Sequence, residues 1–158
     1  MTITLKKFFA AILLLCTSNM VLAQNDESLM TYDLATTAME AAEAYARDKG
    51  WNVTILITDQ NNNIVKLHRL DGAGARTFDF ATAKALVVTE TGLTSGEYGS
   101  RVEAGDIEEI EGGVTFAGGV PVYRGGQLIG SIATSGVRAL QDEEVSMAGV
   151  QAIGSASN

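Results

Sequence analysis

The chain has 158 residues, of which 46% are hydrophobic, and a formal net charge of −8 at pH 7. This length is typical of one domain. The negative charge argues against nucleic acids and anionic membrane surfaces as partners, because both repel an acidic protein.

The first residues have the pattern of a secretory signal peptide. Lys6 and Lys7 form a basic start, residues 8–15 are apolar, and a small-residue cleavage motif ends at Ala23. We therefore expect residues 1–23 to be removed, leaving a single domain over residues 24–158 in the periplasm or the medium. An uncleaved membrane anchor is the alternative, but the apolar run is short for a membrane span.

Cleavage at this site would also change the chemistry of the chain. The only cysteine, Cys16, would leave with the signal, so the exported protein would hold no thiol and no disulfide. The loss of Lys6 and Lys7 would take the net charge to −10. We expect no contact with the membrane after cleavage.

The first half of the domain predicts a helix, a strand hairpin and a second helix. The first helix starts at Ser28 or Thr31 and ends near Lys49, strands follow at 51–58 and 64–70, and the second helix covers 77–90. The turn between the strands contains Asn62, and Asn tolerates a left-handed backbone. Residues at helical spacing predict the inner faces of these helices: Leu34, Ala38, Ala41 and Tyr45 in the first, and Phe78, Ala81, Ala85 and Val88 in the second, with Lys84 beside the stripe.

The second half predicts a short helix at 94–101, an acidic segment, a hairpin and a last helix at 139–153. Five acids lie within 102–113, which we interpret as a solvated loop, with a cation site as the alternative. The hairpin spans 116–136, turns at Gly125-Gly126, and contains Pro121, which belongs on an edge strand. Because hairpins dominate, we predict an α+β fold, an antiparallel sheet with helices packed on it.

Four motifs in this order resemble those of the GlcG/HbpS-like haem-binding family, to which the C-terminal domain of PduO is related. They are the segment 58–73 ending in RLDGA, AxxKA at 81–85, GGVPV at 118–122 with SG at 135–136, and QDE at 141–143. The resemblance spans about residues 34–153. It implies a profilin-like fold, a homo-oligomer, and binding of haem or a related tetrapyrrole. Asn62 stands where the family usually has a turn glycine.

A pocket for a small acidic ligand is predicted where charges and glycines converge. Arg69 and Lys84 would pair with a propionate or another acid. The alternative is an internal ion pair of Asp71 with Lys84 or Arg69. The predicted ligand-binding residues are Arg69, Asp71, Gly72, Lys84, Gly118 and Gly119.

His68 is the only histidine, so an imidazole ligand to haem iron must be His68. The alternative is a strand residue without a ligand role, because the neighbouring sequence shows no partner for the ring. Tyr123 and Met147 are weaker ligand candidates.

The sequence is compatible with three functions. The first is a binding protein for haem, a related tetrapyrrole or another small acidic cofactor. The second is a small enzyme that acts on a 2-hydroxy acid or degrades haem, with Lys84 or His68 as the base. The third is a structural oligomer without a ligand. The shortage of groups that titrate near neutral pH favours binding without turnover.

Overall fold

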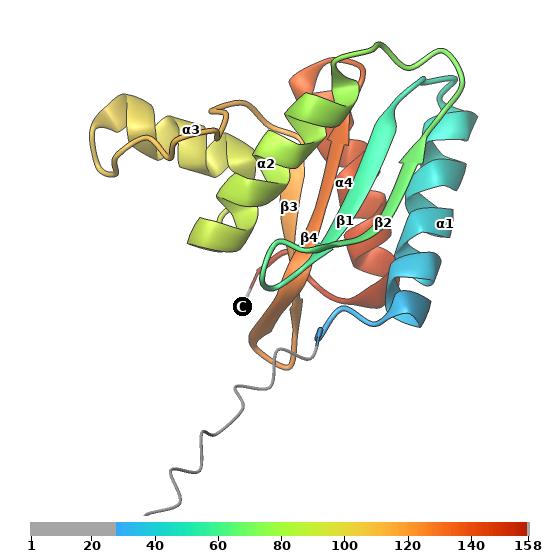
Figure 1. The fold of residues 1–158 in the computed structure, drawn as a ribbon, viewed down its shortest axis with the longest axis horizontal. Helices are drawn as coiled ribbons and strands as arrows, with labels where there is room; N and C mark the ends of the chain where they lie inside the picture. The colour runs from blue at the N-terminus through green and yellow to red at the C-terminus, as the bar shows by residue number, and fades with distance from the viewer. Residues whose placement is uncertain (1–27, 158) are drawn as a thin grey trace, which may run out of the picture.

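The computed structural model describes residues 28–157, so the predicted signal peptide lies outside the described residues. Helices and strands follow one another in the predicted order (Figure 1). They are α1 (Tyr32–Asp48), β1 (Thr54–Asp59), β2 (Ile64–Arg69), α2 (Thr77–Thr91), α3 (Ser95–Ala104), β3 (Gly119–Arg124), β4 (Gln127–Ser135) and α4 (Ala139–Ile153).

The four strands form one antiparallel sheet in the order β2-β1-β4-β3. Both predicted hairpins are present, and they join through the pairing of β1 with β4. Asn62 holds a φ of 62° in the first turn, as its residue type predicts. Pro121 lies on β3 at the edge of the sheet, where its missing N–H removes no internal ladder bond.

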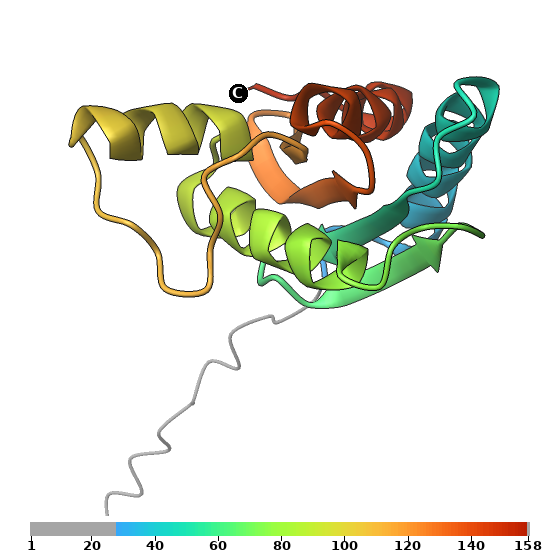
Figure 2. The ribbon, with the colours of Figure 1, turned by 90° about the horizontal axis from the view of Figure 1, so that it is seen from above.

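Helices cover both faces of the sheet, which confirms the predicted α+β fold. Helices α1 and α4 pack on one face, called the back, while α2 lies on the front and α3 projects away from the body (Figures 1 and 2). The main core lies at the back and includes Ile55, Ile57 and Ile132. The front core is small and consists of Leu56, Ala81, Ala85 and Ala133, with the partly buried Leu67 packed against it.

The inner face of α1 differs from the prediction by about one residue. Leu34, Ala41 and Tyr45 are only half-buried. Alanines reach the centre because α1 meets α4 closely, where Gly149 would clash with the Ala38 carbonyl if it carried a Cβ. The fully buried positions of α1 are Ala35, Ala38, Met39, Ala42 and Ala46.

The inner face of α2 also differs. Phe78 was predicted inside but is 41% exposed, whereas Lys84 was predicted beside the stripe and is 0% exposed. Small side chains at Ala81 and Ala85 let α2 sit close to the sheet, which leaves Phe78 on the flank. Lys84 is drawn in by polar partners rather than by apolar packing.

Candidate functional site

The structure separates the predicted site residues into two groups at one end of the sheet. His68, Arg69, Asp71 and Gly72 lie at the end of β2, whereas the second group, Lys84, Gly118 and Gly119, lies at the start of β3. Strands β2 and β3 are the opposite edges of the sheet. Three strand spacings of about 4.8 Å put these edges about 14 Å apart. The two groups therefore do not line one small cavity.

Two adjoining cavities, of about 330 and 300 Å³, open at the end of β2. Both are lined by Arg47, Leu70 and Asp71. We call this region the edge site. Its further lining residues are Glu43, Leu67, His68 and Arg69 in one cavity, and Gly50, Trp51 and Asn52 in the other.

His68 has a partner that the local sequence does not reveal. Its Nδ1 lies 2.9 Å from Oε2 of Glu43 on α1, and its side chain is 43% exposed. No residue within 28–157 forms a hydrogen bond with the other ring nitrogen, Nε2. A carboxylate behind an imidazole is typical of metal-binding histidines, because it fixes the tautomer and the orientation of the ring.

Glu43 is the site residue that sequence reasoning missed. It also accepts two hydrogen bonds from Arg47, one turn later on α1, at 2.5 and 2.9 Å. The hydrogen bond from His68, followed by that from Arg47, lowers the pKa of the Glu43 carboxyl. The Glu43–Arg47 spacing was visible in the sequence, but its contact with His68 joins residues 25 positions apart.

The two arginines of the edge site keep donors for an anion. Arg47 uses Nε and Nη2 on Glu43, and Arg69 donates through Nη2 to the carbonyl of Ala73. A guanidinium has five N–H donors, so each retains at least three. Gly72 has a structural role instead, because its φ is +84° and an added Cβ would lie 2.7 Å from the Asn52 amide.

Lys84 belongs to a buried ion pair between the two helix layers. Its Nζ donates to Oδ2 of Asp142 on α4 and to the carbonyl of Thr134, each at 2.8 Å. The ring of Phe116 lies over it, with 5.0 Å from Nζ to the ring centroid. The partner of Lys84 is thus Asp142, not Asp71. A propionate would have to displace Asp142 to reach this ammonium group.

Gly118 and Gly119 make room for this ion pair. A Cβ at Gly118, where φ is +127°, would run into Lys84 Nζ, and one at Gly119 would lie 3.0 Å from the Lys84 Cβ. The carbonyl of Gly118 accepts a hydrogen bond of 2.7 Å from Ser146 on α4. Both glycines therefore serve close packing of β3 against α2 and α4.

Burial opposes charge in this region. It raises the pKa of the Asp142 carboxyl and lowers the pKa of the Lys84 ammonium, while attraction within the pair acts in the opposite direction on each. Burial also raises the pKa of Glu143, the next residue on α4. These charges therefore depend on one another to remain buried.

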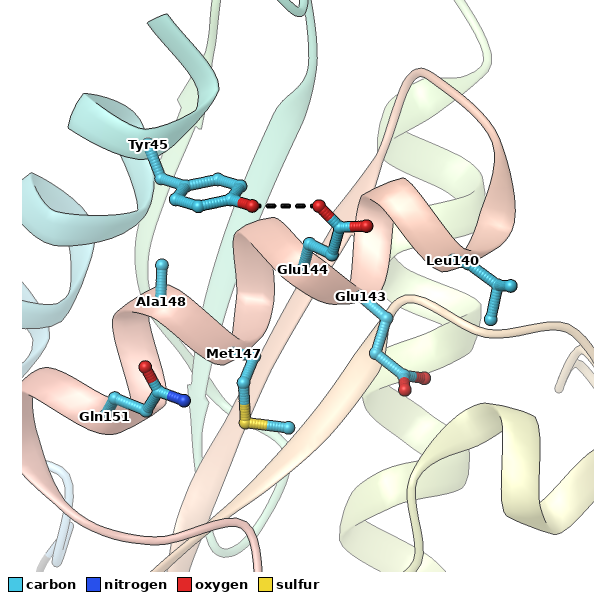
Figure 3. Close-up of a pocket in the computed structure, with 7 residues that line it drawn as sticks. All are labelled: Tyr45, Leu140, Glu143, Glu144, Met147, Ala148 and Gln151. Carbon is cyan, nitrogen blue, oxygen red and sulfur yellow. Dashed lines mark hydrogen bonds between the residues drawn. The ribbon is translucent and has the colours of Figure 1, made fainter. Parts of the chain in front are cut away.

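A third cavity, of about 490 Å³, lies on the outer side of α4 beside α1 (Figure 3). It is lined by Tyr45, Leu140, Glu143, Glu144, Met147, Ala148 and Gln151. Tyr45 donates a hydrogen bond of 2.8 Å to Glu144, which raises the pKa of the Tyr45 phenol. The cavity includes the weaker ligand candidate Met147. Two carboxylates and no basic side chain line it, so it is poorly suited to propionates.

The acidic segment forms the end of α3 and the loop after it. Helix α3 continues to Ala104, three residues beyond the predicted end. The five acids of this segment are exposed. Among residues 28–157, no group of three or more His, Cys, Asp or Glu side chains is arranged to hold a metal ion. No helix in this part of the chain is long and apolar enough to cross a membrane.

The protein has the fold of α+β proteins in which helices pack on a profilin-like antiparallel sheet. A family model described as "Haem degrading protein HbpS-like" matches residues 30–151, and the chain belongs to this HbpS-like family. Protein GlcG of Escherichia coli K12 is 27% identical over 117 residues, which cover 68% of this chain and 81% of GlcG.

Solved structures agree with this assignment. A double mutant of HbpS from Streptomyces reticuli is 31% identical with a TM-score of 0.73, and the match covers 79% of this chain and 87% of that one. A PduOC:heme complex has a TM-score of 0.75 at 22% identity, covering 81% of this chain and 98% of that one. At that identity, the second match supports the fold alone.

Removal of Lys84 alone should be strongly destabilising. Lys84→Met leaves the Asp142 carboxylate buried without its partner, and we expect a loss of about 3–5 kcal/mol in the free energy of unfolding. The double variant Lys84→Met/Asp142→Leu should recover much of this loss. Urea unfolding of the parent, both single variants and the double variant measures the coupling. Additive losses in the double variant would contradict the mutual dependence of the two charges.

Proposed function

We propose that this protein binds haem at the edge site, with His68 as an axial ligand and Arg47 and Arg69 as partners of the propionates. The observation that carries this proposal is the 2.9 Å contact between His68 and Glu43. Membership of the HbpS-like family supports it, because the description of the family model names haem degradation. A protein of the same fold is described as a heme complex.

The side chains of the edge site fit the chemistry of haem. Haem offers an iron that takes axial ligands, an apolar ring and two anionic propionates. The edge site offers one imidazole, two guanidinium groups and the apolar side chains of Trp51 and Leu70. Glu43 adds a negative charge, but its carboxylate is engaged by Arg47 and His68.

Each residue of the edge site has a separate role in this proposal. Glu43 accepts the Nδ1–H of His68, which would leave the lone pair of Nε2 free to hold the haem iron. Arg47 and Arg69 supply positive charge and fork-shaped donors for carboxylates. Lys84 does not bind haem in this proposal, because its buried ammonium group is already hydrogen-bonded to Asp142 and Thr134.

Haem titration of variants tests the edge site. We expect His68→Ala to shift the Soret band and weaken binding at least about tenfold, because it removes the axial imidazole. Glu43→Gln should keep the type of spectrum and weaken binding about 10- to 100-fold, the usual effect of losing a partner behind a ligand. Lys66→Ala is the matched control. It removes a basic residue of β2 that bonds Thr36 on α1 instead of lining the edge site.

If His68→Ala keeps the haem affinity, the Soret band and the circular dichroism spectrum of the parent, the edge site is excluded as the place where haem binds. Binding would then have to occur elsewhere, and Met147→Leu would test the cavity on α4. A parent protein that does not bind haem would exclude the function itself.

Haem degradation is the second candidate function, supported by the description of the family model. With a reductant and dioxygen as co-reactants, we expect a degrading protein to bleach the Soret band of bound haem faster than that of free haem. His68→Ala should remove this difference. Equal rates of Soret bleaching for bound and free haem would contradict degradation and support haem binding without turnover.

The proposal includes export and self-association. Export rests on the pattern of residues 1–23, and self-association rests on the family resemblance. Mass spectrometry of the protein recovered from the periplasm or the medium should give a chain that begins at Gln24. A recovered chain that still contains Met1 would contradict cleavage.

A further inference from the structure

Two aromatic side chains at the end of α1 lie between the edge site and the cavity on α4. Trp51 lines one of the two cavities of the edge site, and Tyr45 lines the cavity on α4. Their ring centroids are 6.1 Å apart, and the ring planes meet edge to face at 63°. Among residues 28–157, no other aromatic ring contacts Trp51. The pair therefore connects two surface regions that otherwise have separate linings.

The backbone after α1 holds this pair in place. Gly50, with a φ of +69°, reverses the chain: its N–H donates to the Arg47 carbonyl at 3.0 Å, and the Trp51 N–H donates to the Ala46 carbonyl at 2.9 Å. These two bonds form a Schellman motif, in which the residue after the glycine packs against the last turns of the helix. In this chain that contact is Trp51 against Tyr45, and both rings also pack against the main core. Their separation is therefore determined by the fold.

Tyr45 has a proton acceptor in direct contact. Its hydroxyl donates a hydrogen bond of 2.8 Å to Oε2 of Glu144 (Figure 3). A phenol gives up an electron readily only when its proton leaves as well, because the radical cation of a phenol is a strong acid. A carboxylate at hydrogen-bond distance is positioned to take that proton. Lys49 lies over the same ring, 5.3 Å from its centroid, but its ammonium is exposed and is 3.9 Å from Asp48.

Trp51 suits the other end of the pair. It is the only tryptophan in the chain, and indole is among the side chains that lose one electron most easily. An indole needs no adjacent base for this step, because its radical cation is a weak acid. At neutral pH a tyrosyl radical that has lost its proton is lower in energy than a tryptophanyl radical. Electron transfer from Tyr45 to oxidised Trp51 is therefore favourable once Glu144 holds the proton.

We propose that Trp51 and Tyr45 form a one-electron relay that carries oxidising equivalents from the edge site to the cavity on α4. A one-electron oxidant in the edge site removes an electron from Trp51. Tyr45 then passes an electron to Trp51, and its phenolic proton moves to Glu144. A neutral phenol or hydroquinone in the cavity on α4 returns one electron and one proton to Tyr45, and Glu144 releases its proton to water.

The relay deepens the proposed function and rests on it for the source of oxidants. Peroxides yield one-electron oxidants wherever haem is bound, because radical and oxygen chemistry belongs to that cofactor. An oxidising equivalent that leaves through Trp51 does not attack the imidazole of His68. The reductant would be neutral rather than anionic, because Glu143 and Glu144 line the cavity on α4.

Pulse radiolysis of the protein without haem tests the relay. Azide radicals oxidise tryptophan in preference to tyrosine, so the pulse creates a radical at Trp51. In the parent, we expect the visible absorption of this radical to decay while the narrow near-ultraviolet band of a tyrosyl radical grows at the same rate, independently of protein concentration. Tyr45→Phe should lose this growth, although its phenyl ring can keep the packing contact with Trp51.

Two further variants separate the relay from a purely structural role. Tyr32→Phe is the matched control, because it removes the hydroxyl of a 65% exposed tyrosine at the start of the same helix and should keep the rate of the parent. Glu144→Gln can still accept the hydrogen bond but binds a proton far less well. We expect it to slow the growth of the tyrosyl band at least about tenfold, because water then has to take the proton.

The possible failures are distinguishable. A Trp51 radical that decays in the parent without a tyrosyl band overturns the relay. Growth that persists in Tyr45→Phe, or that is lost in Tyr32→Phe, overturns the assignment to Tyr45, and an unchanged rate in Glu144→Gln overturns the role of Glu144. Because haem is absent, the result does not depend on the haem titration, whose failure would overturn the proposed function alone. Circular dichroism checks that each variant is folded.

Discussion

The buried contact between Lys84 and Asp142 is the constraint on which the arrangement of this protein depends. It joins α2 on the front of the sheet to α4 on the back, around the end of β4. A buried ammonium must keep its partners, because an unpaired buried charge costs several kcal/mol. The positions of both helices are therefore coupled to each other.

The same contact determines how the chain enters β3. Gly118 and Gly119 pass so close to Lys84 that neither position accommodates a side chain. Ser146 of α4 then bonds both the Gly118 carbonyl and the hydroxyl of Thr134. The packing of three elements around one charge thus accounts for Lys84, Gly118 and Gly119, for which the convergence of charges and glycines in the sequence predicts a ligand pocket.

The proposed functional site lies away from this constraint. The edge site is at the β2 edge, where the chain ends a strand and leaves His68 and two arginines accessible. A ligand can bind there without opening the Lys84–Asp142 pair, because β1 and β4 separate β2 from β3.

The sequence by itself determined the local features of this protein. Turn chemistry at Asn62 and Gly125-Gly126 predicts both hairpins, Pro121 predicts an edge strand, and helical spacing predicts α1, α2 and α4 to within a few residues. These features depend on neighbouring residues, whose backbone preferences act over a few positions. The single histidine also identified the only possible imidazole ligand.

Only the tertiary structure decided which side chains meet. Glu43 reaches His68 across 25 residues and Asp142 reaches Lys84 across 58. No local pattern encodes such contacts, because they arise when separate elements pack on the two faces of one sheet. The hydrophobic pattern of the second helix likewise predicts Phe78 in the core and Lys84 beside it. The structure reverses this order, because hydrogen bonds to a carboxylate and a carbonyl stabilise a buried ammonium, and close packing of alanines leaves no room for the phenyl ring.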